Sequence, residues 1–161
     1  MKFTLKVFLI IFFVSCNNKI SGVIVNDKEY NKKIELIIDG YENKDLSPLS
    51  QFLDDQITST YSTNVFFGKK SLINTWNNDY YYFKDIELLN REIYTVYNKD
   101  LTFTTVLKSN MKAIGKFSGL EIKIHSYYEF VWKNDKIIII NTYFDNYPYY
   151  LEIKEYYKNT I

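Results

Sequence analysis

Residues 120–146 read LEIKIHSYYEFVWKNDKIIIINTYFDN, and this stretch decides the fold. Asn134-Asp135 separates two segments rich in β-branched and aromatic residues, which predicts a hairpin with a two-residue turn. Because side chains alternate along a strand, the paired residues of such a hairpin share one face. The expected pairs, counted from the turn, are Lys133–Lys136, Trp132–Ile137, Phe130–Ile139, Tyr128–Asn141, Ser126–Tyr143 and Ile124–Asp145.

This face of the hairpin has the composition of a small-molecule site. It is apolar near the turn and polar at the other end, and an apolar floor with a few convergent polar groups is typical of a ligand pocket. Trp76, from an earlier predicted helix, is expected on the same wall, with plain core packing as the alternative. The hairpin residues expected to line the pocket are Ser126, Tyr128, Asn141, Tyr143 and Asp145.

The opposite face of the hairpin is too apolar to be left in water. A surface of that kind favours association, and we expect a homodimer through this outer sheet face. His125 is expected at this surface or interface rather than in a catalytic triad, because it points away from its neighbour Ser126. The residues assigned to this face are His125, Tyr127, Val131, Ile138, Ile140 and Phe144.

The chain before the hairpin predicts helices first and strands afterwards. Helices are expected to open at Asn26, at Ser47-Pro48 and after Gly68, each with an apolar face, and residues 56–61 form a short strand. From Asp85 the apolar period changes to two. The expected strands are 86–97, 101–108, 111–117, 120–132 and 136–146, with 101–117 as one long bent strand in the alternative.

This order is an α+β layout, in which the helices pack on an antiparallel sheet. No repeat or flexible linker interrupts it, so residues 26–161 are expected to form one domain. Residues 148–161 fit a further strand or a helix equally well.

The N-terminus resembles a bacterial export signal. Lys2 and Lys6 precede a wholly apolar run from Val7 to Val14, which is too short to cross a bilayer as a helix. Residues 13–16, Phe-Val-Ser-Cys, resemble a lipobox, with Phe13 where leucine is usual. We therefore expect residues 1–15 to be a signal peptide, Cys16 to be lipidated, and residues 16–25 to be a tether to a membrane of the bacterial cell envelope. The alternative is a buried first strand of a cytoplasmic protein.

Composition excludes several classes of function. Lys and Arg total 20 against 19 for Asp and Glu, so the chain lacks the basic excess of a nucleic-acid-binding domain. One Cys and one His provide neither a disulfide framework nor an ordinary zinc site. No phosphate-binding glycine loop or dinucleotide fingerprint is present, and we expect no metal and no cofactor.

Several short motifs carry a family resemblance through their order and spacing. They are Lys116-Phe117-Ser118-Gly119, Val131-Trp132, Asn134-Asp135-Lys136-Ile137 and Tyr143-Phe144-Asp145. With the helical first half and Gly68, they resemble the nuclear transport factor 2-like superfamily, SnoaL-like branch, over residues 27–147. Asp135 departs from the pattern, since glycine is usual at that place in the turn. The resemblance implies a strongly bent, cystatin-like sheet that helices close into a cone with one apolar pocket.

The resemblance does not imply one activity, because members include isomerases, cyclases, dehydratases, epoxide hydrolases and non-catalytic binding domains. We expect a domain that binds a small apolar or aromatic ligand, or a protein partner, without catalysis. The alternative is a cofactor-independent isomerase or dehydratase. In that case Asp145 is the general base and Tyr128 or Tyr143 polarises a carbonyl.

Asp145 has a plainer alternative role, as a cap of the turn before Pro148. Asp54 and Asp55 stand near the base of some isomerases, although an exposed helix end accounts for them as well.

Overall fold

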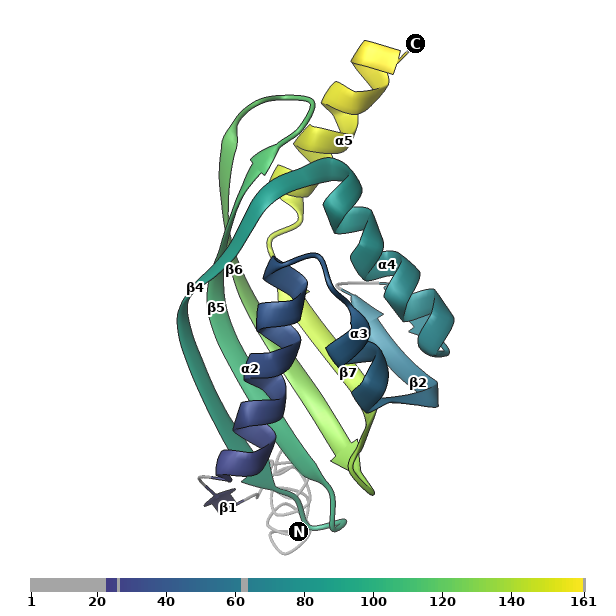
Figure 1. The fold of residues 1–161 in the computed structure, drawn as a ribbon, viewed down its shortest axis with the longest axis vertical. Helices are drawn as coiled ribbons and strands as arrows, with labels where there is room; N and C mark the ends of the chain where they lie inside the picture. The colour runs from purple at the N-terminus through teal and green to yellow at the C-terminus, as the bar shows by residue number, and fades with distance from the viewer. Residues whose placement is uncertain (1–22, 26, 62–63, 161) are drawn as a thin grey trace, which may run out of the picture.

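The computed structural model describes residues 23–25, 27–61 and 64–160. The signal peptide expected over residues 1–15, Cys16 and the tether as far as residue 22 lie outside this range. Helices come early and strands follow, which gives the α+β architecture expected from the sequence (Figure 1). In chain order the elements are β1 (Val23–Val25), α2 (Lys28–Glu42), α3 (Ser47–Phe52), β2 (Leu53–Tyr61), β3 (Asn64–Phe67), α4 (Lys69–Tyr82), β4 (Phe83–Tyr97), β5 (Phe103–Gly115), β6 (Glu121–Lys133), β7 (Lys136–Phe144) and α5 (Tyr147–Thr160).

The seven strands form one sheet in the order β1-β4-β5-β6-β7-β2-β3. All neighbours are antiparallel except β2 and β7, which run parallel. β4 is strongly bent, and its register against β5 shifts twice, close to Asp85 and Asn90, whose φ angles are +53° and +52°. Residues in this left-handed conformation form bulges that bend a strand. The predicted strands 101–108 and 111–117 are one long strand, β5, as in the alternative reading.

Helices α2, α3 and α4 pack on the concave face of the sheet (Figure 1). α2 begins after Asp27, whose side chain accepts a hydrogen bond from the Glu29 amide at 2.9 Å, so the cap lies one residue after the expected Asn26. The inner side of α2 buries Ile34, Ile37 and Ile38 against the sheet. The apolar periodicity of this segment therefore positions one wall of the interior.

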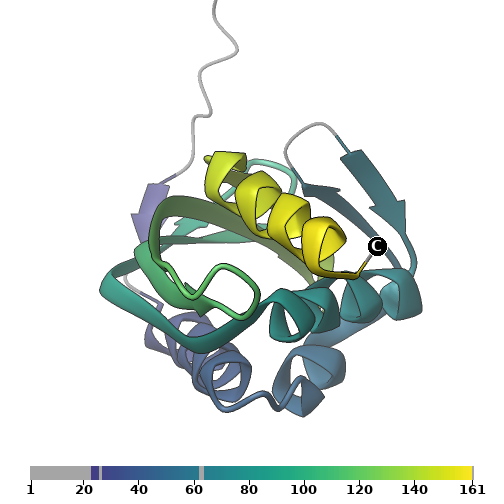
Figure 2. The same ribbon diagram turned by 90° about the horizontal axis from the view of Figure 1, so that it is seen from above.

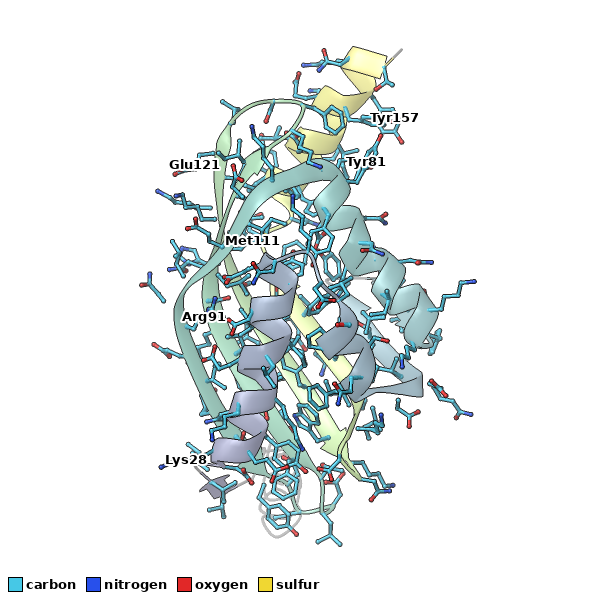
Figure 3. The ribbon with its side chains drawn as sticks, viewed as in Figure 1. Lys28, Tyr81, Arg91, Met111, Glu121 and Tyr157 are labelled. Atoms are coloured by element: carbon cyan, nitrogen blue, oxygen red, sulfur yellow. The ribbon has the colours of Figure 1, made fainter. Side chains whose placement is uncertain are left out.

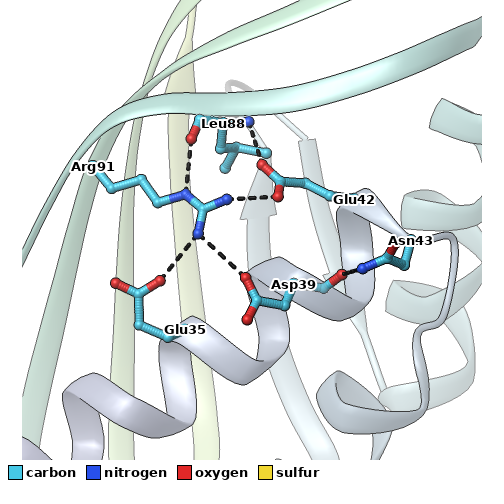
Figure 4. A network of polar contacts seen from close by, with 6 residues as sticks. All are labelled: Glu35, Asp39, Glu42, Asn43, Leu88 and Arg91. Atoms are coloured by element: carbon cyan, nitrogen blue, oxygen red, sulfur yellow. Dashed lines mark hydrogen bonds and ion pairs between the residues drawn. The ribbon is translucent and has the colours of Figure 1, made fainter.

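Arg91 of β4 holds this strand against α2 (Figure 4). Its guanidinium contacts Glu42 at 2.6 Å, Glu35 at 3.1 Å and Asp39 at 3.3 Å, all from α2. Its Nε donates to the Leu88 carbonyl oxygen at 2.8 Å, which holds the side chain close to the bend in β4. One arginine thus joins three acidic residues spaced along a helix to a bent strand.

The hairpin of β6 and β7 has the predicted turn but a different register beyond it. Asn134 and Asp135 both have positive φ, as a two-residue hairpin turn requires, and the pairs Lys133–Lys136 and Trp132–Ile137 are formed. Ile138 then bulges, so that Val131 pairs with Ile139. From this point every residue of β7 lies on the opposite face from the one expected. Thr142 is the partner of Tyr128, Tyr143 is the partner of Tyr127, and Phe144 is the partner of Ser126.

Two end segments complete the fold. Val23–Val25 pair with Thr95–Tyr97 of β4, so the last residues of the expected tether are an edge strand. Residues 147–160, for which a strand and a helix were both open, form helix α5. Seen from above, α5 lies across the end of the cone (Figure 2), at the opposite end of the molecule from β1 (Figure 1).

Candidate functional site

A cavity of about 30 Å³ lies between α2, α4, the concave face of the sheet and the start of α5. Met111 of β5 lies on its wall, and Figure 3 labels it near the upper end of α2. A cavity of this size accommodates one or two water-sized groups. Its wall is rich in aromatic side chains, which come from α2, β2, α4, β6, β7 and α5. They are Tyr41, Tyr61, Trp76, Tyr128, Phe130, Phe144 and Tyr149.

Asp79 is the carboxylate on this wall, and two tyrosines hold it. The Tyr41 hydroxyl donates to Oδ2 at 2.7 Å and the Tyr149 hydroxyl donates to Oδ1 at 2.6 Å. The side chain is buried, with 7% of the residue exposed. Burial raises the pKa of Asp79 to about 6, and the two hydrogen bonds oppose that rise because they favour the charged form. Asp79 therefore titrates close to neutral pH within an apolar enclosure.

The tyrosines around Asp79 stay protonated over the physiological range. Burial, reinforced by the nearby charge of Asp79, raises the pKa values of Tyr41, Tyr61 and Tyr128 above their ordinary value. The pKa of Tyr149 rises for the same two reasons. These phenols thus remain neutral hydrogen-bond donors, and Asp79 is the group whose charge responds to pH.

No lysine, arginine or histidine is among the described residues that line the cavity. In the described part of the chain, no cluster of three or more His, Cys, Asp or Glu side chains is arranged to hold a metal ion. None of the described helices combines the length and the apolar character needed to cross a bilayer.

Because no basic side chain is among the described residues that line the cavity, the negative charge of Asp79 is offset by hydroxyl donors rather than by a cation.

Three of the six residues expected to line a pocket lie on the cavity wall: Ser126, Tyr128 and Trp76. Ser126 is also paired across the sheet, with its hydroxyl oxygen 2.8 Å from that of Ser109. Tyr128 and Trp76 face each other, with ring centroids 6.3 Å apart. Even-numbered residues of β6 point inward, as the alternation predicted.

The other three expected residues lie elsewhere because of the bulge at Ile138. Asn141 and Tyr143 are on the outer face, where the Asn141 amide donates to Glu129 at 3.0 Å and Tyr143 is exposed. Asp145 is exposed beyond the end of β7, and its carboxylate accepts a hydrogen bond from the Tyr147 amide at 3.0 Å. The plainer reading of Asp145, a cap of the turn before Pro148, is the one that the geometry supports. Asp145 is therefore not on the cavity wall, where a base acting on a bound molecule would have to lie.

The same bulge changes the outer face expected to form a dimer. Ile140 is buried in the core and Phe144 lines the cavity, so neither belongs to the outer surface. His125 is exposed on that surface, and its Nδ1 lies 2.6 Å from Oδ1 of Asn110. Asp54 and Asp55 are not on the cavity wall.

Asp79, Tyr41 and Tyr149 are the residues that sequence reasoning missed. Asp79 follows Leu72 and Trp76 at the spacing of one helix face, and these three are the buried residues of α4. An acid at an inward position of an amphipathic helix is the signal that could have identified it. Tyr149 gave no such signal, because it reaches the site only through the path of α5.

α5 covers the cavity and is held by a second buried acid. Glu152, 1% exposed, accepts hydrogen bonds from the backbone amides of Phe117 and Ser118 in the loop between β5 and β6. Gly115 leaves room for this carboxylate, since a Cβ there would collide with it. Tyr156 of α5 packs against Tyr81 and Phe117, with ring centroids 5.5 and 4.9 Å apart. Tyr149, anchored on Asp79, forms the inner edge of this cover.

The sequence matches no family model, and no curated protein is significantly similar to it. Solved structures do share its fold. A proposed polyketide cyclase from Xanthomonas campestris is 9% identical with a TM-score of 0.67, and the match covers 80% of this chain and 99% of that one. A nuclear transport factor 2-like protein of unknown function from Burkholderia pseudomallei is 10% identical with a TM-score of 0.63, covering 76% and 95%.

A third match is a hypothetical protein with a ketosteroid isomerase-like fold from Catenulispora acidiphila, solved in complex with trimethylamine. It is 7% identical with a TM-score of 0.59, covering 70% of this chain and 84% of that one. At these identities the likeness concerns the fold alone. The chain therefore has the nuclear transport factor 2-like cone, the fold of SnoaL-like proteins, as its sequence motifs suggested.

Proposed function

We propose that this domain binds a small molecule in the cavity beneath α5, with Asp79 as its polar anchor, and that it does so without catalysis. The observation that carries the proposal is a buried carboxylate on an otherwise largely aromatic and aliphatic wall. An apolar enclosure with a few convergent polar groups is the usual composition of a ligand site. Both oxygens of Asp79 already accept a tyrosine hydroxyl, which suits a fixed anchor better than a base that must take up a substrate proton.

The size of the cavity defines how a ligand enters. About 30 Å³ is too small for a molecule of five or more heavy atoms unless a wall moves, since a benzene-sized ligand occupies a cavity of roughly 150 Å³. The start of α5 is the wall best suited to move, because it lies across the end of the cone (Figure 2) and carries Tyr149. Binding therefore requires the start of α5 to shift outward, while the Glu152 carboxylate keeps the helix attached to the loop between β5 and β6.

The test is methyl NMR on the isoleucine- and methionine-labelled domain, titrated with water-soluble alcohols, phenols, ketones and amines of four to ten heavy atoms. We expect saturable shifts for Ile37, Met111 and Ile124 on the cavity wall, and none for Ile137, which is buried elsewhere in the core. Asp79→Asn should change the affinities, whereas the matched variant Asp145→Asn at the exposed carboxylate should not. Absence of saturable shifts for every compound up to about 10 mM would count against the proposal, because even fragments of this size bind efficient sites within that range.

A second function is favoured by the burial of Asp79 on the cavity wall, which raises its pKa to about 6. A general base works best when its pKa lies near the working pH, and apolar enclosure is how such values arise. In a cofactor-independent isomerase or dehydratase, Asp79 would then hold the role that the sequence suggested for Asp145. Turnover of a carbonyl substrate that falls by about 10² or more in Asp79→Asn, and is unchanged in Asp145→Asn, would establish this function instead.

We also propose that the chain is exported and anchored to a membrane of the bacterial cell envelope through lipid on Cys16. The signal-like run of residues 1–15 and the position of the cysteine support this proposal. The stretch from Cys16 to Val23, where β1 begins, spans at most about 25 Å when extended, which would keep the β1 end of the cone near the bilayer. Incorporation of labelled palmitate should be lost in Cys16→Ala, and retention of the label would contradict the anchor.

A further inference from the structure

The hydrogen bonds to Asp79 favour its charged form. Each of its two oxygens accepts a hydroxyl from a different tyrosine, Oδ2 from Tyr41 and Oδ1 from Tyr149. Hydroxyl donors stabilise a carboxylate more strongly than a neutral carboxyl group, so both contacts lower the cost of holding the charge. The arrangement therefore suits the carboxylate anion, which brings a full negative charge to the cavity wall.

No positive group on the described wall balances this charge. Among its described residues the wall has no lysine, arginine or histidine. The ion pairs of the described residues all lie elsewhere, such as the pair between Arg91 of β4 and Glu42 of α2. A buried charge without a partner of opposite sign is costly, and two neutral donors compensate it only in part. A positively charged ligand would recover this cost on binding, whereas a neutral ligand would not and an anionic ligand would be repelled.

The rest of the wall also favours a cation. Trp76 contacts both Tyr41 and Tyr128, with ring centroids 5.3 and 6.3 Å away, so these three rings surround one side of the cavity. Tyr61 and Phe144 pack together on β2 and β7, with centroids 4.6 Å apart. The faces of aromatic rings carry negative potential and attract ammonium groups, most strongly where water is excluded.

We propose that the ligand of this cavity is a small organic cation, a primary alkylammonium, whose charged head sits between Asp79 and the surrounding aromatic rings. This inference rests on the proposed function, since it names the class of molecule that the same cavity takes. The size of the cavity agrees with it, because an ammonium head is close to the size of a water molecule. The alkyl tail then extends past Tyr149 toward α5.

The experiment compares n-butylammonium with n-butanol, which has the same number of heavy atoms and no charge. Both are titrated into the domain at pH 7.5 and followed through the methyl signals of Met111 and Ile124. We expect n-butylammonium to bind at least tenfold more tightly than n-butanol. This preference should vanish in Asp79→Asn and persist in Asp145→Asn, whose carboxylate is exposed.

A pH series on the unmodified domain makes the test independent of whether Asp79→Asn folds. The titratable groups that interact with Asp79 are Tyr41 of α2, Tyr61 of β2, Tyr80 of α4, Tyr128 of β6 and Tyr149 of α5. All have raised pKa values, so none titrates below pH 8. The alkylammonium also stays charged there. Affinity for n-butylammonium should fall about tenfold from pH 7.5 to pH 5, while affinity for n-butanol stays constant.

The possible outcomes distinguish two claims, that the cavity binds a small molecule and that this molecule is a cation. Equal or tighter binding of n-butanol overturns the cationic ligand and leaves a cavity that binds neutral molecules, and a preference for n-butylammonium that persists in Asp79→Asn overturns Asp79 as the partner of the cation. If neither compound shifts the signals of Met111 and Ile124, the cationic ligand is overturned as well, and the wider series of alcohols, phenols and ketones decides whether the proposed function fails with it.

Discussion

The hairpin of β6 and β7 has two ends that differ in packing and in chemistry. At the closed end, next to the turn, Trp132 is fully buried and packs on Tyr30 and Phe52, with ring centroids 5.0 and 5.9 Å away. At the cavity end, Tyr128 and Phe144 border a space of about 30 Å³. β6 and β7 run through both ends. The difference in packing between the ends therefore comes from the side chains that α2, α3, α4 and α5 place against the hairpin at each end.

The polar atoms of the two ends differ in the same way. At the closed end the Trp132 Nε1 donates to the Thr105 hydroxyl at 3.1 Å, and Thr105 in turn contacts Thr95 at 3.0 Å. These neutral groups satisfy one another. At the cavity end the central polar group is the Asp79 carboxylate, whose burial costs free energy that folding alone does not require. The closed end thus stabilises the fold, and the cavity end retains a group whose chemistry is available to a ligand.

The largest effect is expected from Trp132→Ala at the closed end. This change removes the largest fully buried side chain and leaves a cavity, which costs about 3–5 kcal/mol. Trp76→Ala at the cavity end should cost measurably less, because Trp76 already borders the empty space of the cavity. Urea unfolding of both variants measures the difference, and equal costs would contradict the division into a packed end and an open one.

The next largest effect is a pH dependence of stability that comes from the cavity end. The pKa of Asp79 is about 6 in the folded protein and about 3.9 in an unfolded chain. Between these values the folded state binds the extra proton, so the contribution of Asp79 to stability is greatest below pH 4 and is lost as pH rises to 6. The two values correspond to a loss of roughly 3 kcal/mol.

Asp79→Asn removes this titration. The free energy of unfolding of the variant, relative to the unmodified domain, should therefore rise by roughly 3 kcal/mol between pH 4 and pH 7.5. The other carboxylates titrate in both proteins and cancel in the comparison. Urea unfolding across this range tests the prediction, and a constant difference between the two proteins would mean that Asp79 titrates as an ordinary exposed acid.

The sequence predicted the closed end of the hairpin better than the cavity end. The turn at Asn134-Asp135 and the pair Trp132–Ile137 are confirmed, because turn residues and a tryptophan facing the helices specify them. The register beyond them was wrong because Ile137–Ile140 is apolar at every position. A strand without alternation does not indicate which face is inward, so the bulge at Ile138 leaves no trace in the sequence.

The candidate site was predicted in part for a related reason. Ser126 and Tyr128 lie on β6, where alternation is clear, and both were assigned to the correct face. Asp145 was assigned through the incorrect register of β7. Asp79 was overlooked because an acid in an Asn-Asn-Asp-Tyr run resembles a solvent-exposed turn of helix, and only its spacing from Leu72 and Trp76 places it inward.

A third prediction concerns Arg91, which attaches α2 to β4. Arg91→Ala should cost about 1–3 kcal/mol, because it leaves Glu35, Asp39 and Glu42 close together without their shared cation. Lys108→Ala is the matched control, since Lys108 makes an exposed pair with Glu92 at 3.6 Å that contributes little. If the two variants lose equal stability in urea, the Arg91 network has no more effect than an ordinary surface pair.

The smallest effect is expected at the turn of the closed end. Asp135 has a φ of +59°, which glycine adopts without strain, so Asp135→Gly removes a cost of up to about 1 kcal/mol. The same change removes the ion pair with Lys33 at 3.1 Å, which offsets a similar amount at most. The net change in the free energy of unfolding should lie within about 0.5 kcal/mol of zero.

In a Lys33→Ala background the ion pair is already absent, and Asp135→Gly should then stabilise the domain. A substitution that is destabilising in both backgrounds would show that Asp135 contributes to the closed end through something other than its charge, with its contact to the Tyr30 hydroxyl at 3.3 Å as the next candidate.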